Sequence, residues 1–181
     1  MMVMTRRRWL ARLARDERGV SAVEFALLAP LMIGLYLGCA EISDGVAADR
    51  KVSLTAAAVA NLTSQVTTIS TADMNNILDA SAAIIVPYSA NNLKITVSCL
   101  NIDANKNVTV KWTATRNGGV AGSTSVPSAL KVPNSQLVLS EVSYAYKPTV
   151  GYTITGTLTL SDHMFMSPRI SAPSYNNASC T

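Results

Sequence analysis

Hydrophobic and polar positions divide the chain into contrasting stretches. The first 19 residues are rich in arginine, whereas residues 20–40 contain a single charged side chain, that of Glu24. At about 1.5 Å per residue, a helix over residues 20–40 is roughly 31 Å long, which matches the hydrocarbon layer of a bilayer. The pattern therefore predicts one membrane-spanning helix, which Pro30 is expected to kink.

Beyond Glu41 the pattern becomes amphipathic. Apolar residues recur at spacings of three and four, which places them on one face of a helix: Val52, Ala56, Val59, Leu62 and Val66. No proline interrupts residues 46–66, so the membrane helix is expected to continue outward as one rod over residues 20–66. Gly45 is its expected bend.

A second, shorter helix is predicted after residue 70. Ser70 and Asp73 have the spacing of a capping box at a helix start. The following apolar residues share one face of this helix: Met74, Ile77, Leu78, Ala82 and Ile85. Pro87 is expected to end it, because the residue before a proline avoids helical geometry.

Alternating apolar and polar residues then predict four β-strands. These are residues 93–99, 108–115, 137–146 and 152–160. In the second strand, one face is expected to hold Val108, Val110, Trp112 and Ala114. The other stretches are expected to be a turn, two connections and an irregular tail: residues 103–107, 117–133, 148–151 and 161–181. A long helix, a short helix and meandering strands indicate the α+β class.

The charge is concentrated at the N-terminus. Of the 181 residues, the first 19 hold six arginines and two acidic residues, whereas the remainder holds nine basic and nine acidic residues. By the positive-inside rule, the arginine-rich end stays cytoplasmic and the residues after the span face outward. A neutral outer part argues against nucleic-acid binding, because such binding needs positive charge on the folded domain.

The three cysteines divide between two environments. Cys39 lies in the predicted span, where a thiol acts as a small apolar group. Cys99 and Cys180 lie in the exported part, where oxidation is allowed, and can pair. Closing a loop of about 80 residues would stabilise the fold by ~4 kcal/mol in the chain-entropy model. The alternative is two free thiols in a reduced compartment, and the predicted topology argues against it.

Nothing in the sequence indicates an enzyme. His163 is the only histidine, so it is expected to be a surface or packing residue rather than a catalyst or part of a zinc cluster. Phosphate-binding, dinucleotide-binding and zinc-protease motifs do not occur in the sequence. We therefore predict no enzymatic activity, no cofactor and no metal site.

The junction between the basic leader and the apolar span carries a resemblance. Arg18 and Gly19 precede Val20, and Glu24 and Phe25 follow at the fifth and sixth positions after the glycine. This arrangement resembles the processing site of type IV-type pilins. The resemblance implies that a prepilin peptidase cuts after Gly19, that Val20 becomes the new N-terminus, and that Glu24 acts in assembly with the aromatic Phe25 beside it.

Two later segments extend the resemblance and point to one family of pilins. Residues 144–148 (Tyr-Ala-Tyr-Lys-Pro) and 163–169 (His-Met-Phe-Met-Ser-Pro-Arg) resemble the closing motifs of the TadE-like family of minor pilins, or pseudopilins, from Tad/Flp tight-adherence pili. The chain continues well beyond its helix, unlike the major Flp pilins. The resemblance implies partners of three kinds: the prepilin peptidase, other Tad pilins with inner-membrane assembly components, and membrane lipid.

These expectations give a three-part organisation. Residues 1–19 are a cleaved cytoplasmic leader, residues 20–66 the transmembrane and amphipathic helix, and residues 67–181 an exported α+β domain. The resemblance implies a single-pass protein of the bacterial inner membrane that supports assembly of an adhesion pilus.

The chemistry of Glu24 can be argued from the residues themselves. A cut after Gly19 would give Val20 an α-ammonium with a pKa near 8, one helical turn from the Glu24 carboxylate. Such a pair, within one subunit or between two, would favour one axial register of packed helices, because an unpaired charge in apolar surroundings is costly. The alternative is a glutamate that only snorkels to the membrane surface.

Two other processing routes define a different class of function. Gly38 and Ala40 are small residues at the spacing of an ordinary signal-peptidase site, which would release a secreted domain beginning at Glu41. Leu37, Gly38 and Cys39 resemble a lipoprotein site, although Tyr36 stands where an aliphatic residue is expected. Either route would produce a secreted or lipid-anchored adhesive or carbohydrate-binding domain.

Overall fold

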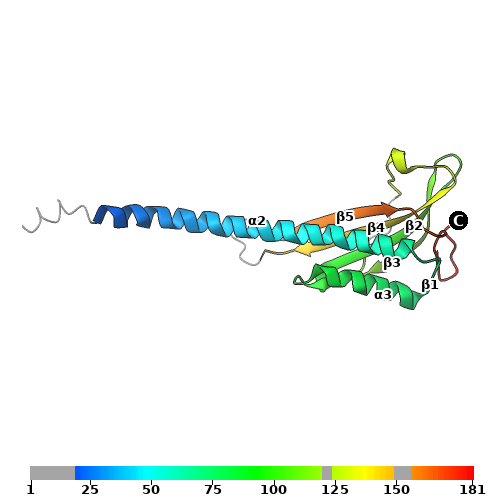
Figure 1. The fold of residues 1–181 in the computed structure, drawn as a ribbon, viewed down its shortest axis with the longest axis horizontal. Coiled ribbons are helices and arrows are strands. Elements are labelled where there is room, and N and C mark those ends of the chain that lie inside the picture. The colour runs from blue at the N-terminus through cyan, green and yellow to red at the C-terminus, as the bar shows by residue number, and fades with distance from the viewer. Residues whose placement is uncertain (1–18, 120–123, 149–155) are drawn as a thin grey trace, which may run out of the picture.

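The computed structural model describes residues 19–119, 124–148 and 156–181. Figure 1 shows one long helix, α2 (Val20–Ser64, 45 residues), whose second half lies along a compact domain and whose first half extends away from it. The remaining elements follow in chain order: β1 (Thr68–Ile69), α3 (Thr71–Ala82), η2 (Ala83–Ile85), η3 (Ala90–Asn92), β2 (Leu93–Ile102), β3 (Val108–Arg116), η4 (Ser128–Leu130), β4 (Ser135–Tyr146), β5 (Leu158–Met166) and β6 (Ser174–Tyr175). The predicted α+β class is confirmed.

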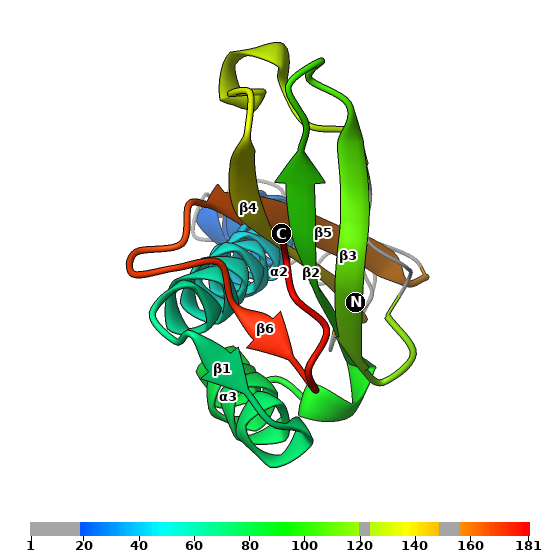
Figure 2. The ribbon, with the colours of Figure 1, turned by 90° about the vertical axis from the view of Figure 1, so that its right-hand side faces the viewer.

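The strands form two sheets. The main sheet is antiparallel with the order β3-β2-β4-β5, and β1 pairs with β6 in a separate parallel pair. Figure 2 views the domain from its far end and shows β6 beside β1, near α3. The C-terminal segment therefore returns to the end of α2, where β6 pairs with β1.

The main core lies between α2, α3 and one face of the main sheet. Ala48, Val52, Ala56 and Val59 of α2 have no exposed surface and belong to this core. The residues that meet them come from α3, β2 and β4 and include Met74, Leu78, Ile95, Val97, Val138 and Val142. Small and β-branched residues on α2 let the helix approach the sheet closely, and burying this apolar surface drives the packing.

The amphipathic stripe of α2 is confirmed at three of its five predicted positions. Leu62 and Val66 are more than one-third exposed, whereas Thr63 is fully buried. The helix ends at Ser64, so Val66 lies beyond it. The buried face continues from Val59 to Thr63, a step of four rather than three, because that side of the last turn meets the sheet. The helix runs without interruption through Pro30 and Gly45, where a kink and a bend were expected.

The start of α3 agrees with its prediction. The Ser70 hydroxyl accepts a hydrogen bond from the Asp73 backbone N–H at 3.2 Å, and the Asp73 carboxylate accepts one from the Ser70 N–H at 3.1 Å. This reciprocal pair is a capping box. Hydrogen bonds from Ser70 hold the pKa of the Asp73 carboxyl below its ordinary value.

The faces of β3 differ from the expected alternation. Trp112 and Ala114 lie in the main core, but Val108 and Val110 pack against a second cluster on the opposite face of the sheet. The pairing explains the difference: Cys99 is opposite Trp112 and the next residue, Leu100, is opposite Val110, so Lys111 is an extra residue in β3. Because of this β-bulge, the residues before Lys111 in β3 occupy the opposite face from the one that simple alternation predicts.

The second cluster covers the outer face of the sheet at the end far from the free part of α2. It contains Leu100, Ile102, Leu137, Leu139 and Val126. Val126 comes from the connection between β3 and β4, which the sequence predicts as a loop. Gly119, just after β3, lies against β2: an added Cβ there would lie 2.7 Å from the Ile95 carbonyl oxygen, so only glycine fits.

The last predicted strand is shifted towards the C-terminus. Part of the expected strand, residues 152–155, lies outside the described residues, as do residues 149–151 of the expected hairpin connection. The strand β5 continues through residues 161–166, which were expected to be irregular, because each residue from Leu158 to Met166 pairs with β4. Register with β4, rather than local pattern, places these residues in the sheet.

The rest of the tail is held by long-range contacts. The Arg169 N–H donates to the Ser64 carbonyl at 2.9 Å, which satisfies a carbonyl at the end of α2. The Trp112 Nε1–H donates to the Pro173 carbonyl at 2.9 Å, and its ring lies 5.5 Å from that of Tyr175. These partners are distant in sequence, so the local pattern of the tail gives no sign of them.

We predict that Ser70→Ala lowers the free energy of unfolding by about 1 kcal/mol, because the first turn of α3 loses its cap. Urea unfolding of the purified protein in detergent measures the change. Ser171→Ala, an exposed serine outside any helix start, is the matched control and should change stability by less than about 0.5 kcal/mol. Equal effects of the two substitutions would contradict the role of the capping box.

Candidate functional site

The candidate site is the start of α2. Gly19 is its N-cap residue. Because glycine has no side chain, no side-chain hydrogen bond caps the first turn of the helix. Gly19 is exposed, and an added Cβ would meet no atom within 4 Å. Gly19 has helical backbone angles (φ −77°, ψ −22°) and directly precedes α2, so the predicted cleavage point lies next to the first residue of the long helix. Nothing within the described part of the chain covers this junction.

Glu24 lies one turn into the helix. Val20 and Glu24 are four residues apart, so they occupy the same helix face. Each Cα–Cβ bond in an α-helix tilts towards the N-terminus, so the Glu24 side chain is directed towards the turn that carries Val20. Glu24 and Phe25 are exposed. The spacing allows a carboxylate at Glu24 to approach an α-amino group at Val20, or that of a neighbouring copy.

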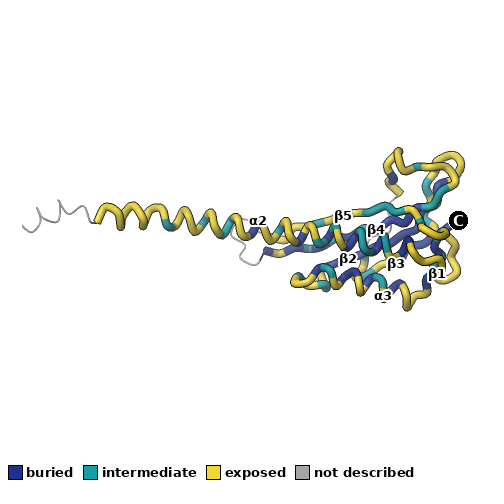
Figure 3. Tube along the Cα trace, in the orientation of Figure 1, coloured by how far each residue is buried: buried dark blue, intermediate teal, exposed yellow. Residues whose placement is uncertain are grey.

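The rest of the first half of α2 is apolar and exposed. Large hydrophobic side chains cover all sides of this segment: Val20, Val23, Phe25, Leu27, Leu28, Leu31, Met32, Ile33, Leu35 and Tyr36. Figure 3 shows this part of the helix as mostly exposed, with a few intermediate positions and no buried residue before the domain begins. Among the described residues, α2 is the one helix long and apolar enough to cross a membrane, and its most apolar 18-residue stretch contains no buried residue.

The environment of α2 changes at Glu41. Glu41 is 3 % exposed and is the first buried residue of the helix. Cys39, two residues earlier, is exposed and has a free thiol. The residues predicted as an alternative cleavage site, Gly38 to Glu41, therefore lie within a continuous helix that enters the domain at its next turn.

Aromatic residues meet α2 at this entry point. The Tyr88 hydroxyl donates to the Asp44 carbonyl at 3.0 Å, and the Tyr88 ring lies 6.3 Å from Tyr144 and 6.0 Å from Tyr146. Burial raises the pKa of Tyr88 and of Tyr146, and the charge of Asp44 adds to both shifts. Tyr144 and Tyr146 are both buried in the main core.

Cys99 and Cys180 form a disulfide with a Cα–Cα distance of 5.9 Å. Both residues are fully buried in the main core. The Asn101 side chain also donates to the Cys180 carbonyl at 3.3 Å. The disulfide therefore attaches the second-last residue of the chain to the central strand β2, near the end of the domain that is far from the apolar segment.

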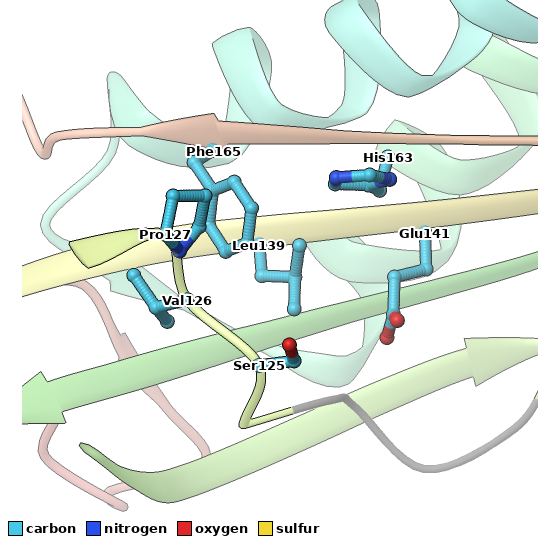
Figure 4. A pocket seen from close by; sticks show the side chains of 7 residues that line it. All are labelled: Ser125, Val126, Pro127, Leu139, Glu141, His163 and Phe165. Carbon is cyan, nitrogen blue, oxygen red and sulfur yellow. The ribbon is translucent and has the colours of Figure 1, made fainter. Parts of the chain in front are cut away.

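A hollow of about 320 Å³ lies on the outer face of the sheet. Figure 4 shows the side chains that line it: Ser125, Val126, Pro127, Leu139, Glu141, His163 and Phe165. Ser125, Glu141 and His163 are the residue types of a hydrolytic triad, which requires the serine to hydrogen-bond to the histidine. In Figure 4 the Ser125 hydroxyl and the His163 ring lie apart, and the ring packs edge-on against Phe165 at 5.5 Å.

The sequence did not indicate this hollow. Its lining joins the connection between β3 and β4 to strands β4 and β5, so it forms only when residues 125–127 fold over the sheet. Within residues 19–119, 124–148 and 156–181, no group of three or more His, Cys, Asp or Glu side chains is arranged to hold a metal ion.

The fold and the site together define a class of protein: a small α+β domain carried on one long helix, whose free half is suited to cross a membrane. Residues 19–61 match the family model of TadE-like proteins. This part of the chain is therefore similar to TadE-like proteins, which confirms the predicted resemblance there and supports a protein associated with the Tad pilus. No curated protein and no solved structure matches the chain.

The extent of the family match is informative. It begins at Gly19 and ends at Asn61, so it contains the whole apolar segment and most of the half of α2 that packs on the domain. The later segments that contributed to the resemblance, residues 144–148 and 163–169, lie outside the match. Their assignment as closing motifs of the family stays a prediction.

We predict that Cys180→Ala lowers the free energy of unfolding by about 2–4 kcal/mol under non-reducing conditions. Without the cross-link the unfolded chain has more conformational entropy, which favours unfolding. Urea unfolding in detergent measures this loss. Cys39→Ala, which removes the exposed free thiol, is the matched control and should change stability by less than about 0.5 kcal/mol. Peptide mapping that recovers Cys99 and Cys180 as free thiols from the native protein would contradict the disulfide.

Proposed function

We propose that this protein is a minor pilin, or pseudopilin, of a Tad/Flp-type pilus. In this proposal a prepilin peptidase cuts between Gly19 and Val20, and α2 then anchors the chain in the inner membrane with its domain outside. One observation carries the proposal: an exposed glycine directly precedes a long helix whose apolar segment contains no buried residue. The TadE-like match begins at the same glycine.

The proposed role is structural rather than enzymatic. The exported domain would present surfaces to other Tad pilins and to inner-membrane assembly components, while the helix packs against neighbouring helices and lipid. The arginine-rich leader would hold the N-terminus in the cytoplasm before cleavage, because positive charge is retained on that side. The pilus itself would serve adhesion, with this subunit supporting its assembly.

Glu24 supplies the proposed assembly chemistry. After cleavage, the α-ammonium of Val20 and the carboxylate of Glu24 would be opposite charges one turn apart at the edge of the hydrocarbon layer. Charges in that setting strongly favour being paired, because each is poorly solvated when alone. A pair between neighbouring copies would form only when the two helices have the correct stagger. Glu24 would therefore select register rather than add general affinity.

The alternative of a secreted adhesive domain makes a different prediction about the N-terminus. A cut after Ala40 would remove the apolar segment and make Glu41 the new N-terminus. Glu41 now lies in the middle of α2 and is buried against the domain. The core residues of α2 would remain, so such a product is physically possible. The mature N-terminus therefore discriminates between the two functions.

We predict that the protein extracted from membranes of its native bacterium begins at Val20, and intact-mass analysis can read this directly.

Gly19→Glu should cause the uncut form to accumulate, because the peptidase must accommodate a small residue there. A Cβ added at Gly19 would meet no atom within 4 Å, so the effect would report processing rather than folding. Gly19→Ala is the matched control and should retain most processing. A mature chain that begins at Glu41, or at a lipidated Cys39, would refute the proposal.

We further predict that Glu24→Gln leaves membrane insertion and cleavage nearly unchanged but reduces surface pili at least tenfold. The substitution preserves shape and removes the charge that would pair with an α-ammonium. Complementation of a deletion strain, scored by pilus yield and by co-purification with other pilins, measures the effect.

Two variants serve as controls for Glu24→Gln. Glu24→Asp keeps a carboxylate and should restore some pili, whereas Asp49→Asn removes an exposed acidic charge from the same helix outside the apolar segment and should have little effect. Wild-type pilus yield from Glu24→Gln would mean that Glu24 only snorkels to the membrane surface.

A further inference from the structure

One end of the domain lies directly beside the free half of α2. Two contacts fix its level along the helix. The Tyr88 hydroxyl donates to the Asp44 carbonyl, and Tyr146 lies 3.9 Å from the position of a Cβ at Gly45. We call residues 86–88 and 146–147 the proximal end of the domain. Its position on α2 is therefore set by packing, not by a flexible linker.

The depth of the proximal end follows from helix geometry. The uncharged part of the span ends at Ala40, and Asp44 lies four residues, or about 6 Å, further along the helix. The headgroup layer adds roughly 5–8 Å on each side of a hydrocarbon core about 30 Å thick. If α2 spans the membrane, the Tyr88 hydroxyl lies at the level of the lipid headgroups. Tyrosine is enriched at this depth in membrane proteins, because its ring is apolar and its hydroxyl is polar.

The chain returns to this level from the far end of the domain. Figure 1 shows α3 running back beside α2 towards the free half of the helix. The Lys51 ammonium donates to the Ile84 carbonyl at 3.2 Å, which fixes the segment after α3 against α2. Ile85 is then fully buried, whereas Val86 is 63 % exposed and Pro87 is also exposed. An apolar tip, Val86–Pro87, is thus exposed next to the aromatic contact with α2.

We infer that the proximal end rests in the headgroup layer of the membrane that α2 spans, with Val86 inserted among the lipids. The partner is the lipid surface itself, because the tip is fixed beside a helix whose adjoining segment lies in that bilayer. The exposed Lys147 beside Tyr146 supplies a cation at the level of the lipid phosphates. This inference rests on the proposed membrane anchor. The membrane anchor of α2 and the lipid contact of the proximal end would together hold the domain at one orientation before it joins a pilus.

The test uses the unaltered full-length chain in phospholipid nanodiscs that contain no other pilus protein. Valine methyl groups are isotopically labelled, and signal intensities are compared with and without lipids that carry a spin label at the headgroup. Val132 is the matched control, because it is 57 % exposed and lies just before β4, at the opposite end of the domain. Val23, in the apolar segment, reports the anchor.

We predict at least a twofold loss of signal for Val86 and Val23 and no loss for Val132. Loss at Val23 with Val86 unchanged would overturn the surface contact while leaving the anchor intact. No loss at either residue would overturn both the anchor and the contact. Loss at Val86 only after another Tad pilin is added would also overturn the inference, because the proximal end would then reach the headgroups only when a protein partner positions it there.

Discussion

The structure depends on the packing of the second half of α2 against the inner face of the antiparallel sheet. Ala48, Val52, Ala56 and Val59 are completely buried there, and their small volume brings the helix axis close to the strands. Without this contact the sheet would have one uncovered apolar face and α2 would have no fixed direction. The position of the apolar segment relative to the domain therefore follows from a few small side chains.

The same helix serves two environments. Its first half exposes large apolar side chains in every direction, which suits lipid or neighbouring helices but not water. From Glu41 onward one face is buried in the domain and the other is exposed. Because the two halves form one continuous helix, a force or a register shift applied to the apolar half is transmitted directly to the domain. This coupling is what an assembly subunit would require, since helix stagger would then set the spacing of the domains.

At the far end of the domain, covalent and polar contacts add to the two apolar clusters. The disulfide between Cys99 and Cys180, the hydrogen bond from Trp112 to Pro173, and the pairing of β6 with β1 all attach the C-terminal segment there. A domain of this size buries a limited apolar area, so cross-links of this kind contribute a large share of its stability. The contacts that hold the C-terminal segment at the far end are thus separate from those of Tyr88 and Tyr146 with α2 at the proximal end.

The sequence by itself determined the elements whose signals are local. The apolar segment, the capping box at Ser70 and the alternation in β2 each depend on neighbouring residues, and each was predictable. The tertiary structure alone decided features that depend on distant partners. An extra residue at Lys111 moves Val108 and Val110 to the opposite face, because pairing with β2 skips one position. Residues 161–166 form a strand because β4 supplies their hydrogen bonds. Likewise, only the folding of α3 back along α2 brings Val86 and Tyr88 to the level where the helix leaves its apolar segment.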